Sequence, residues 1–242
     1  MLTYPLRLAR ILIHLLAGML TIWREFPRLP DAERAARVRV WSRRLLDLLG
    51  IRLEVRGTPV AGGNCLLVSN HVSWVDIFIY LALQPVRFVS KAEVRRWPLA
   101  GWLAAHTGTL FLEREKRTDA ARVNHAIGGV LAAGGRVGLF PEGTTSDGTT
   151  LHAFHASLLE PAVLAAATVQ PAAVRYLTPG GAYCRAPAYE GDTTLMQTLR
   201  AMAAEKDIVA QVTFLDPIAA QGHRRRELAC LSEAAIRRAL GL

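Results

Sequence analysis

Short apolar runs alternate with longer amphipathic stretches from residue 65 onward, and this rhythm restricts the fold more than any other feature of the chain. Each run has the length of a buried strand and each stretch the length of a helix. Such alternation predicts an α/β fold: a mixed, largely parallel sheet flanked by helices. The predicted strands cover residues 65–69, 86–89, 109–112, 137–140, 168–175 and 209–214. The predicted helices cover residues 74–83, 99–106, 118–133, 154–166, 195–205 and 224–240.

The N-terminal region has a different character. Residues 11–23 are almost wholly apolar and are flanked by Arg7, Arg10 and Arg24. This stretch is shorter than the roughly 20 residues that span a bilayer, so we expect a helix in the membrane interface whose arginines meet lipid headgroups. No A-x-A cleavage site precedes Arg24, which favours a retained anchor over a signal peptide. We therefore expect a membrane-associated helical segment over residues 1–57 and a separate α/β domain over residues 58–242.

A second helical pattern over residues 35–51 fits either a membrane contact or an ordinary surface helix. The whole chain carries a formal net charge of +9, which favours anionic partners. Charge combined with apolar surface favours membrane lipids, and no nucleic-acid-binding fingerprint accompanies it. Cys65, Cys184 and Cys230 form no CxxC pair, so neither a disulfide framework nor a zinc site is indicated. We expect the cytoplasmic face of the inner membrane, with peripheral or monotopic attachment.

The sequence SNHVSWVD at residues 69–76 follows the first predicted strand and leads into a helix. Open α/β sheets commonly carry their sites at such strand ends. If the helix begins near Ser73, the Asp76 carboxylate turns back toward the His71 imidazole. That pair is suited to activating a hydroxyl, which is a poor nucleophile until a base accepts its proton. Alone, the spacing also fits a histidine that caps a turn and an aspartate that caps the helix.

Two further motifs follow predicted strands. In FPEGTTSDG, at residues 140–148, Glu142 stands in a glycine-containing turn, where it binds a hydroxyl, orients a neighbouring arginine or satisfies the local backbone. In GTLFLER, at residues 108–114, Arg114 lies just beyond a strand, where a guanidinium can hold a phosphate in bidentate fashion. Arg114 also begins a charged run, which is more often a solvated surface.

Taken together, these motifs resemble the lysophospholipid acyltransferases, the family that includes bacterial 1-acyl-glycerol-3-phosphate acyltransferase. NHVSWVD is similar to the family's NHxSxxD block, GTLFLER to G-x-x-F-x-x-R, FPEGTTS to FPEGTRS, and VQPAAV to V-x-P-x-x-I/V. The order and separations also agree. With the intervening SKAEVRRWPLAGWL, the resemblance covers about residues 64–175.

The resemblance implies an O-acyltransferase in which His71 is the catalytic base and Asp76 its partner. It also implies a direct transfer without metal or other cofactor, from acyl-CoA or acyl carrier protein to the free hydroxyl of a lysolipid. The acceptor is expected to be 1-acyl-glycerol-3-phosphate, giving phosphatidic acid. The residues expected to bind substrate are Lys91, Arg114, Glu142, Gly143, Thr144 and Thr145.

Two departures from the family pattern keep the acceptor open. Thr145 stands where the family has an arginine, and His155 and Ser157 stand where it has a lysine and a glycine. Losing positive charge where a phosphomonoester is expected weakens the case for lysophosphatidic acid. The FPEGTTSDG form resembles that of members thought to acylate lyso-ornithine lipid, so this acceptor stays an alternative.

Other classes of protein fit the sequence less well. His152 and His155 have the spacing of metal ligands but lack a clear third ligand. A serine hydrolase would need a G-x-S-x-G elbow, which the sequence lacks. The chief alternative to an enzyme is a lipid-binding protein on the same scaffold, and such a protein would have no need of His71.

Overall fold

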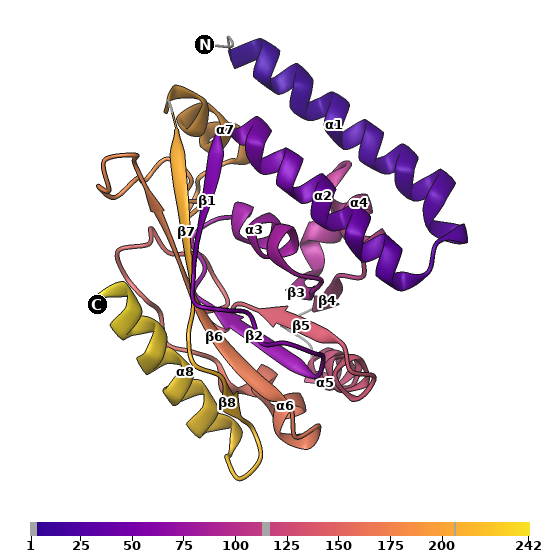
Figure 1. The fold of residues 1–242 in the computed structure, drawn as a ribbon, viewed down its shortest axis with the longest axis vertical. Coiled ribbons are helices and arrows are strands. Elements are labelled where there is room, and N and C mark those ends of the chain that lie inside the picture. The colour runs from indigo at the N-terminus through magenta and orange to yellow at the C-terminus, as the bar shows by residue number, and fades with distance from the viewer. Residues whose placement is uncertain (1–3, 113–116, 206) are drawn as a thin grey trace.

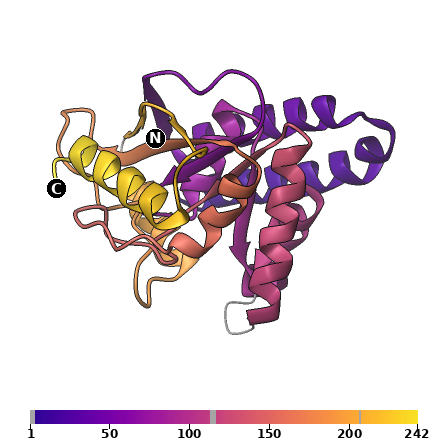
Figure 2. The same ribbon diagram turned by 90° about the horizontal axis from the view of Figure 1, so that it is seen from below.

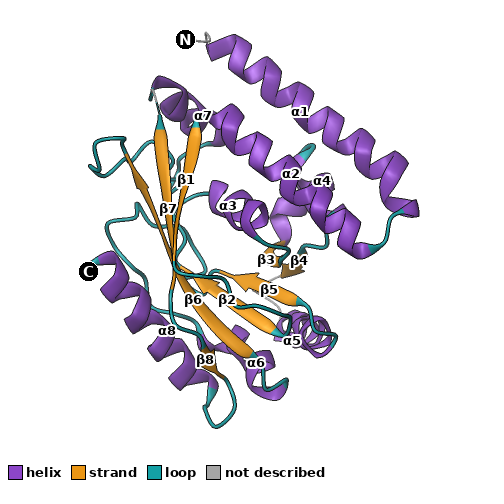
Figure 3. Cartoon of the chain, in the orientation of Figure 1, coloured by secondary structure: helices purple, strands orange, loops and turns teal. Residues whose placement is uncertain are grey.

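The structure is a computed structural model that describes residues 4–112, 117–205 and 207–242. It confirms the predicted α/β class, with helices on both faces of one central sheet (Figure 3). The strands are β1 Ile51–Arg56, β2 Cys65–Ser69, β3 Arg87–Lys91, β4 Leu110–Leu112, β5 Arg136–Leu139, β6 Thr168–Leu177, β7 Ile208–Phe214 and β8 Ile218–Ala219. The α-helices are α1 Tyr4–Glu25, α2 Asp31–Leu49, α3 Val75–Leu83, α4 Ala100–His106, α5 Arg117–Ala132, α6 Glu160–Leu164, α7 Leu195–Ala204 and α8 Arg225–Leu240. Short 3-10 helices are η1 Phe26–Arg28, η2 Ala92–Arg96 and η3 Ala156–Leu159.

The sheet order is β1-β7-β6-β2-β5-β3-β4, and β8 pairs with β6 (Figure 1). Strand β6 pairs antiparallel with β7 and β8, whereas the pairs β1–β7, β2–β6, β2–β5, β3–β5 and β3–β4 are parallel. Because β2, β5, β3 and β4 run in the same direction, their carboxyl ends lie at one edge of the sheet. Three of the predicted motifs follow β2, β5 and β4, so the topology directs them to that edge.

Two apolar cores cover the two faces of the sheet. On one face, α2, α3 and α7 contribute the buried side chains of Leu46, Ile79 and Met202. On the other, α5 and α8 contribute Ile127 and Ile236. Figure 2 shows α5 and α8 on the side of the sheet away from α1 and α2. The sheet is therefore held from both sides, which fixes the strand ends that carry the motifs.

Helix α1 differs in length from the prediction. The apolar stretch over residues 11–23 was expected to be too short to cross a membrane, but the helix runs for 22 residues. Together with the turn that follows it, the segment Tyr4–Arg28 is long and apolar enough for a membrane span. It nevertheless packs along α2 (Figure 1), where a Cβ at Gly18 would lie 2.4 Å from the Trp41 indole nitrogen. Close packing against the body is typical of a helix that is part of the fold.

Other elements also differ from the sequence predictions. Helix α2 ends at Leu49 because Gly50 adopts a left-handed conformation with φ of 74° and its N–H closes the last turn. The chain then enters β1, which was not predicted. The single helix predicted over residues 154–166 is instead η3 followed by α6. Pro161 explains the break, since proline fits the first turn of a new helix but not the interior of a continuous one.

Candidate active site

The structure brings His71 and Asp76 together. His71 lies in the loop after β2, and Asp76 lies in the first turn of α3. The distance from His71 Nδ1 to Asp76 Oδ2 is 2.8 Å. The carboxylate therefore turns back across the start of the helix toward the imidazole, as the five-residue spacing predicted. Because Nδ1 faces a carboxylate, the hydrogen-bond pattern assigns the ring N–H to Nδ1 and leaves Nε2 as the atom that can accept a proton.

Asp76 is fully buried, and both of its oxygens accept hydrogen bonds. Oδ2 also accepts from the backbone N–H groups of Val72 at 2.8 Å and Ser73 at 2.9 Å. Oδ1 accepts from the Tyr176 hydroxyl at 2.6 Å. A buried carboxylate costs much free energy unless it is paired and hydrogen-bonded, and these four donors meet that requirement. They also fix the direction in which Asp76 presents its charge to His71.

The His71 ring is held on its face as well as at Nδ1. It stacks on Phe140 with 3.9 Å between ring centroids and an interplanar angle of 5°. Phe140, the residue after β5, stacks in turn on Phe88 of β3, so two aromatic rings support the imidazole from one side. The His71 side chain keeps 18% exposure, whereas Asp76 keeps none. The imidazole can thus meet a substrate while its partner stays out of water.

Glu142 links the loop that carries His71 to the loop that carries His152 through backbone hydrogen bonds. Oε1 accepts from the His71 N–H at 2.7 Å, and Oε2 accepts from the His152 N–H at 2.8 Å. The residue is 3% exposed, and burial raises its pKa to about 7 against the opposing effect of the two N–H donors. Both oxygens are therefore engaged with the protein itself. Its expected role in binding the acceptor stays a prediction.

The raised pKa of Glu142 predicts a pH-dependent stability. The folded protein binds a proton at Glu142 more tightly than the unfolded chain does, so this residue stabilises most below pH 4.5 and loses its contribution as pH rises to about 7. The full change is at most about 3 kcal/mol. Glu142→Gln cannot titrate, so the free energy of unfolding of the wild type relative to this variant should fall across that interval.

Chemical denaturation at several pH values measures this difference. Glu93→Gln, which removes an exposed carboxylate, corrects for the general loss of one negative charge. A difference between wild type and Glu142→Gln that stays constant or grows from pH 4.5 to 7 would contradict the expectation.

The rest of the EGTTS turn is tied to its surroundings. Gly143 is buried with φ of 73°, a conformation that favours glycine, and its N–H donates to Phe140 O. Thr144 is exposed. The Thr145 hydroxyl donates to the backbone oxygen of Tyr189. The N–H of Ser146 donates to His71 O at 2.8 Å, which joins this turn to the histidine loop.

The two cationic residues expected to bind substrate, Lys91 and Arg114, are placed differently. Lys91 ends β3 and is exposed at the edge of the sheet where the motifs gather. Arg114 lies outside the described residues. Within the described part of the chain, no group of three His, Cys, Asp or Glu side chains is arranged to hold a metal ion.

Two side chains at the site were missed by the sequence analysis. Asn70 is buried, and its amide exchanges hydrogen bonds with the backbone of Val174, donating to the oxygen at 3.0 Å and accepting from the N–H at 2.8 Å. Tyr176 lies two residues farther along β6. The neighbouring position of Asn70 in the SNH motif was a usable signal. Nothing local marks Tyr176, because only the pairing of β6 with β2 brings it to Asp76.

The sequence of this chain is similar to those of known acyltransferases. The family model described as acyltransferase matches residues 52–175. A lyso-ornithine lipid O-acyltransferase from Pseudomonas aeruginosa is 39% identical over 97% of this chain and 92% of its own length. A 1-acyl-sn-glycerol-3-phosphate acyltransferase from Neisseria meningitidis is 35% identical over 77% of this chain and 72% of its own.

A solved structure has the same fold. The 1-acyl-sn-glycerophosphate acyltransferase from Thermotoga maritima superimposes with a TM-score of 0.66 over 97% of this chain and 96% of that one. The two sequences are 20% identical, so this likeness concerns the fold alone.

Proposed function

The chain belongs to the acyltransferase family, and from that premise we propose that it transfers a fatty acyl group from a thioester to the free hydroxyl of a lysolipid. The observation that carries the proposal is the His71–Asp76 pair, with 2.8 Å between Nδ1 and Oδ2 and a buried, fully hydrogen-bonded carboxylate. This arrangement is suited to accepting a proton at Nε2 from an alcohol.

The proposed mechanism is one direct transfer. The acceptor hydroxyl donates its proton to His71 Nε2 while its oxygen attacks the thioester carbonyl. The C–S bond of the tetrahedral intermediate then breaks, and the departing thiolate takes the proton back from the imidazolium. Asp76 stabilises the imidazolium between the two steps. No protein nucleophile, metal or other cofactor takes part, and the acyl donor is acyl-CoA or acyl carrier protein.

Two acceptors have support, and each has its own observation. Acceptance of 1-acyl-glycerol-3-phosphate is supported by the relative from Neisseria meningitidis and by the exposed ammonium group of Lys91 at the motif edge. Lyso-ornithine lipid is supported by the relative that aligns with nearly the whole chain. Thr145 adds to the second case: it supplies no positive charge for a phosphate, and its hydroxyl is bonded to the Tyr189 backbone.

We also propose monotopic attachment at the cytoplasmic face of the inner membrane. Helix α1 is packed on α2 but leaves much of its apolar surface uncovered, and Arg10 and Arg24 are exposed near its two ends. Its exposed large apolar residues are Leu6, Leu12, Ile13, Leu16, Leu20 and Trp23. A helix with this surface fits the interface between headgroups and acyl chains. The cytoplasmic face is supported by the free thiols of Cys65, Cys184 and Cys230, because a reducing compartment keeps cysteines unpaired.

The test is incubation of the purified protein with acyl-CoA or acyl carrier protein thioester and a panel of lysolipids. Thiol release and product mass are followed together. Acylation of lysophosphatidic acid or lyso-ornithine lipid is the expected result, and the ratio of their kcat/KM values decides between the two acceptors. Lipid binding without thiol release from either donor would instead identify a lipid-binding protein on the same scaffold.

A further inference from the structure

We propose that Tyr176 is a positioning residue for the catalytic pair, whose hydroxyl holds Asp76 in the orientation that supports His71. This inference rests on the proposed function and adds a third side chain to it. The distance from the Tyr176 hydroxyl to Asp76 Oδ1 is 2.6 Å, and both residues are almost completely buried. No substrate contact is assigned to Tyr176.

The two oxygens of Asp76 have different partners. Oδ2 accepts from the His71 ring and from the N–H groups of Val72 and Ser73, all of which belong to the loop after β2. Oδ1 accepts from Tyr176, which belongs to a strand on the other side of the carboxylate. Rotation of the carboxylate about its Cβ–Cγ bond would break bonds to both sides. Tyr176 is thus the support that ties Asp76 to the sheet instead of to its own loop.

The sheet fixes where the Tyr176 hydroxyl lies. Strand β6 pairs parallel with β2, which places Ser69 opposite Ala172. Asn70 then holds the backbone of Val174 through two hydrogen bonds. Side chains alternate along a strand, so Val174 and Tyr176 lie on the same face, toward α3 and Asp76. Burial, and then the adjacent Asp76 charge, raises the pKa of Tyr176 well above its ordinary value, so the phenol stays protonated and donates.

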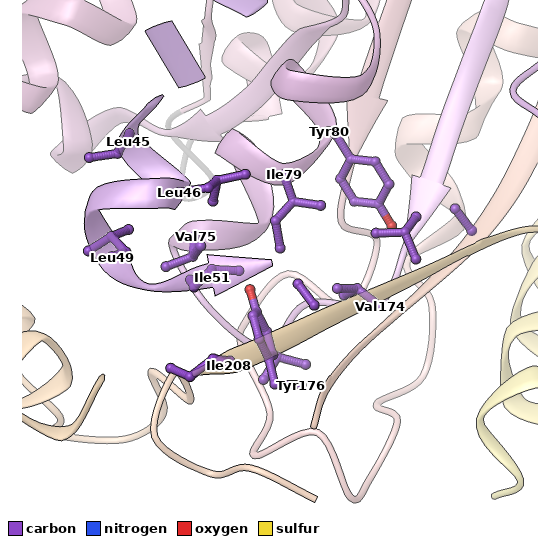
Figure 4. Close-up of a cluster of buried hydrophobic side chains, with 14 of the residues drawn as sticks. Leu45, Leu46, Leu49, Ile51, Val75, Ile79, Tyr80, Val174, Tyr176 and Ile208 are labelled. Carbon is purple, nitrogen blue, oxygen red and sulfur yellow. The ribbon is translucent and has the colours of Figure 1, made fainter. Parts of the chain in front are cut away.

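Tyr80 supplies a matched comparison within the same core. Figure 4 shows Tyr80 on α3 and Tyr176 on β6 among the same buried apolar side chains. Tyr80 is also fully buried, and its hydroxyl is 2.6 Å from the Ser69 hydroxyl. Replacing either tyrosine with phenylalanine removes one buried hydroxyl together with its hydrogen bonding. Only the change at Tyr176 removes a donor from Asp76.

The expected effect is on both rate and pH dependence. The titratable groups that act on Asp76 are His71, Tyr176, Tyr80 and Glu142. Without the Tyr176 hydroxyl, the carboxylate can turn about its Cβ–Cγ bond, so Asp76 holds the His71 ring less firmly and kcat falls. The carboxylate also has one donor fewer, so more of its negative charge acts on the imidazolium. The acidic limb of the kcat/KM profile should therefore move to higher pH.

The experiment compares Tyr176→Phe with Tyr80→Phe in the full-length protein, using acyl-CoA and the lysolipid that the wild type prefers. Tyr176→Phe should lower kcat about tenfold, change KM less than twofold and move the acidic limb upward. Tyr80→Phe should leave the limb in place. An active wild type in which the two variants have the same kcat and the same limb would overturn the role of Tyr176 alone. A wild type without acyl transfer would overturn the proposed function itself.

A second substitution covers the case in which Tyr176→Phe does not fold. Site-specific 3-fluorotyrosine at residue 176 keeps the hydroxyl and nearly the same volume, and it makes the phenol a stronger donor. The acidic limb should then move to lower pH, the opposite direction from Tyr176→Phe. The same substitution at residue 80 should leave the limb unchanged. An unmoved limb with 3-fluorotyrosine at residue 176 would show that the hydroxyl does not act through Asp76.

Discussion

His71→Ala should lower kcat for acyl transfer by about 10²–10⁴-fold, the usual contribution of a positioned general base. His71 Nε2 has the lone pair that can accept the proton of the alcohol, because Nδ1 faces Asp76. The side chain is 18% exposed, so a substrate can contact it. The alcohol would have to attack without losing its proton, so the loss should appear in kcat more than in KM. Thiol release from acyl-CoA measures it.

The control for this variant is His125→Ala, which removes an exposed histidine from α5 on the other face of the sheet. It should retain wild-type activity. The His71→Ala protein should remain folded, because its backbone N–H can still donate to Glu142 and the lost ring is partly exposed. Retention of more than a tenth of wild-type kcat by folded His71→Ala would exclude His71 as the general base.

Much of the fold could be predicted because its signals are local. The buried strands β2 and β6 are continuous apolar runs, and the helices between strands carry clear periodicity. Strand β1 was missed because its six residues, IRLEVR, follow directly on the helical pattern of α2, although their alternation of charged and apolar residues is typical of a half-buried strand. The break between η3 and α6 was missed although Pro161 marks it. In both cases a local signal was present but weaker than the surrounding apolar pattern.

The site residues also differ in whether a local sequence signal predicts their contacts. His71 and Asp76 are five residues apart, so one strand end and one helix start suffice to bring them together. Tyr176 is 100 residues from Asp76, and its contact depends on the pairing of β6 with β2. No spacing rule reaches that far along a chain. Glu142 is intermediate: its motif identified it as a site residue, but only the structure shows that its oxygens accept from the backbone N–H groups of His71 and His152.

Asp76→Asn should lower kcat by about 10²–10⁴-fold while the protein stays folded. Four donors point at the carboxylate, from His71, Val72, Ser73 and Tyr176. An asparagine offers one acceptor oxygen and places an NH₂ group where the other oxygen was. If the NH₂ faces His71, the imidazole must present Nδ1 as an acceptor, and Nε2 then carries the proton and cannot act as the base. If it faces Tyr176, the geometry survives but the imidazolium has no counter-charge.

Either orientation predicts a loss of rate that acts entirely through His71. The double variant His71→Ala with Asp76→Asn should therefore be no slower than His71→Ala alone, because Asp76 has nothing to support once the imidazole is gone. Asp216→Asn, at an exposed aspartate, is the matched control and should keep wild-type activity. Losses in kcat that multiply in the double variant would mean that Asp76 has a second role, independent of the histidine. The thermal midpoint of each variant, measured alongside, separates a loss of chemistry from a loss of folded protein.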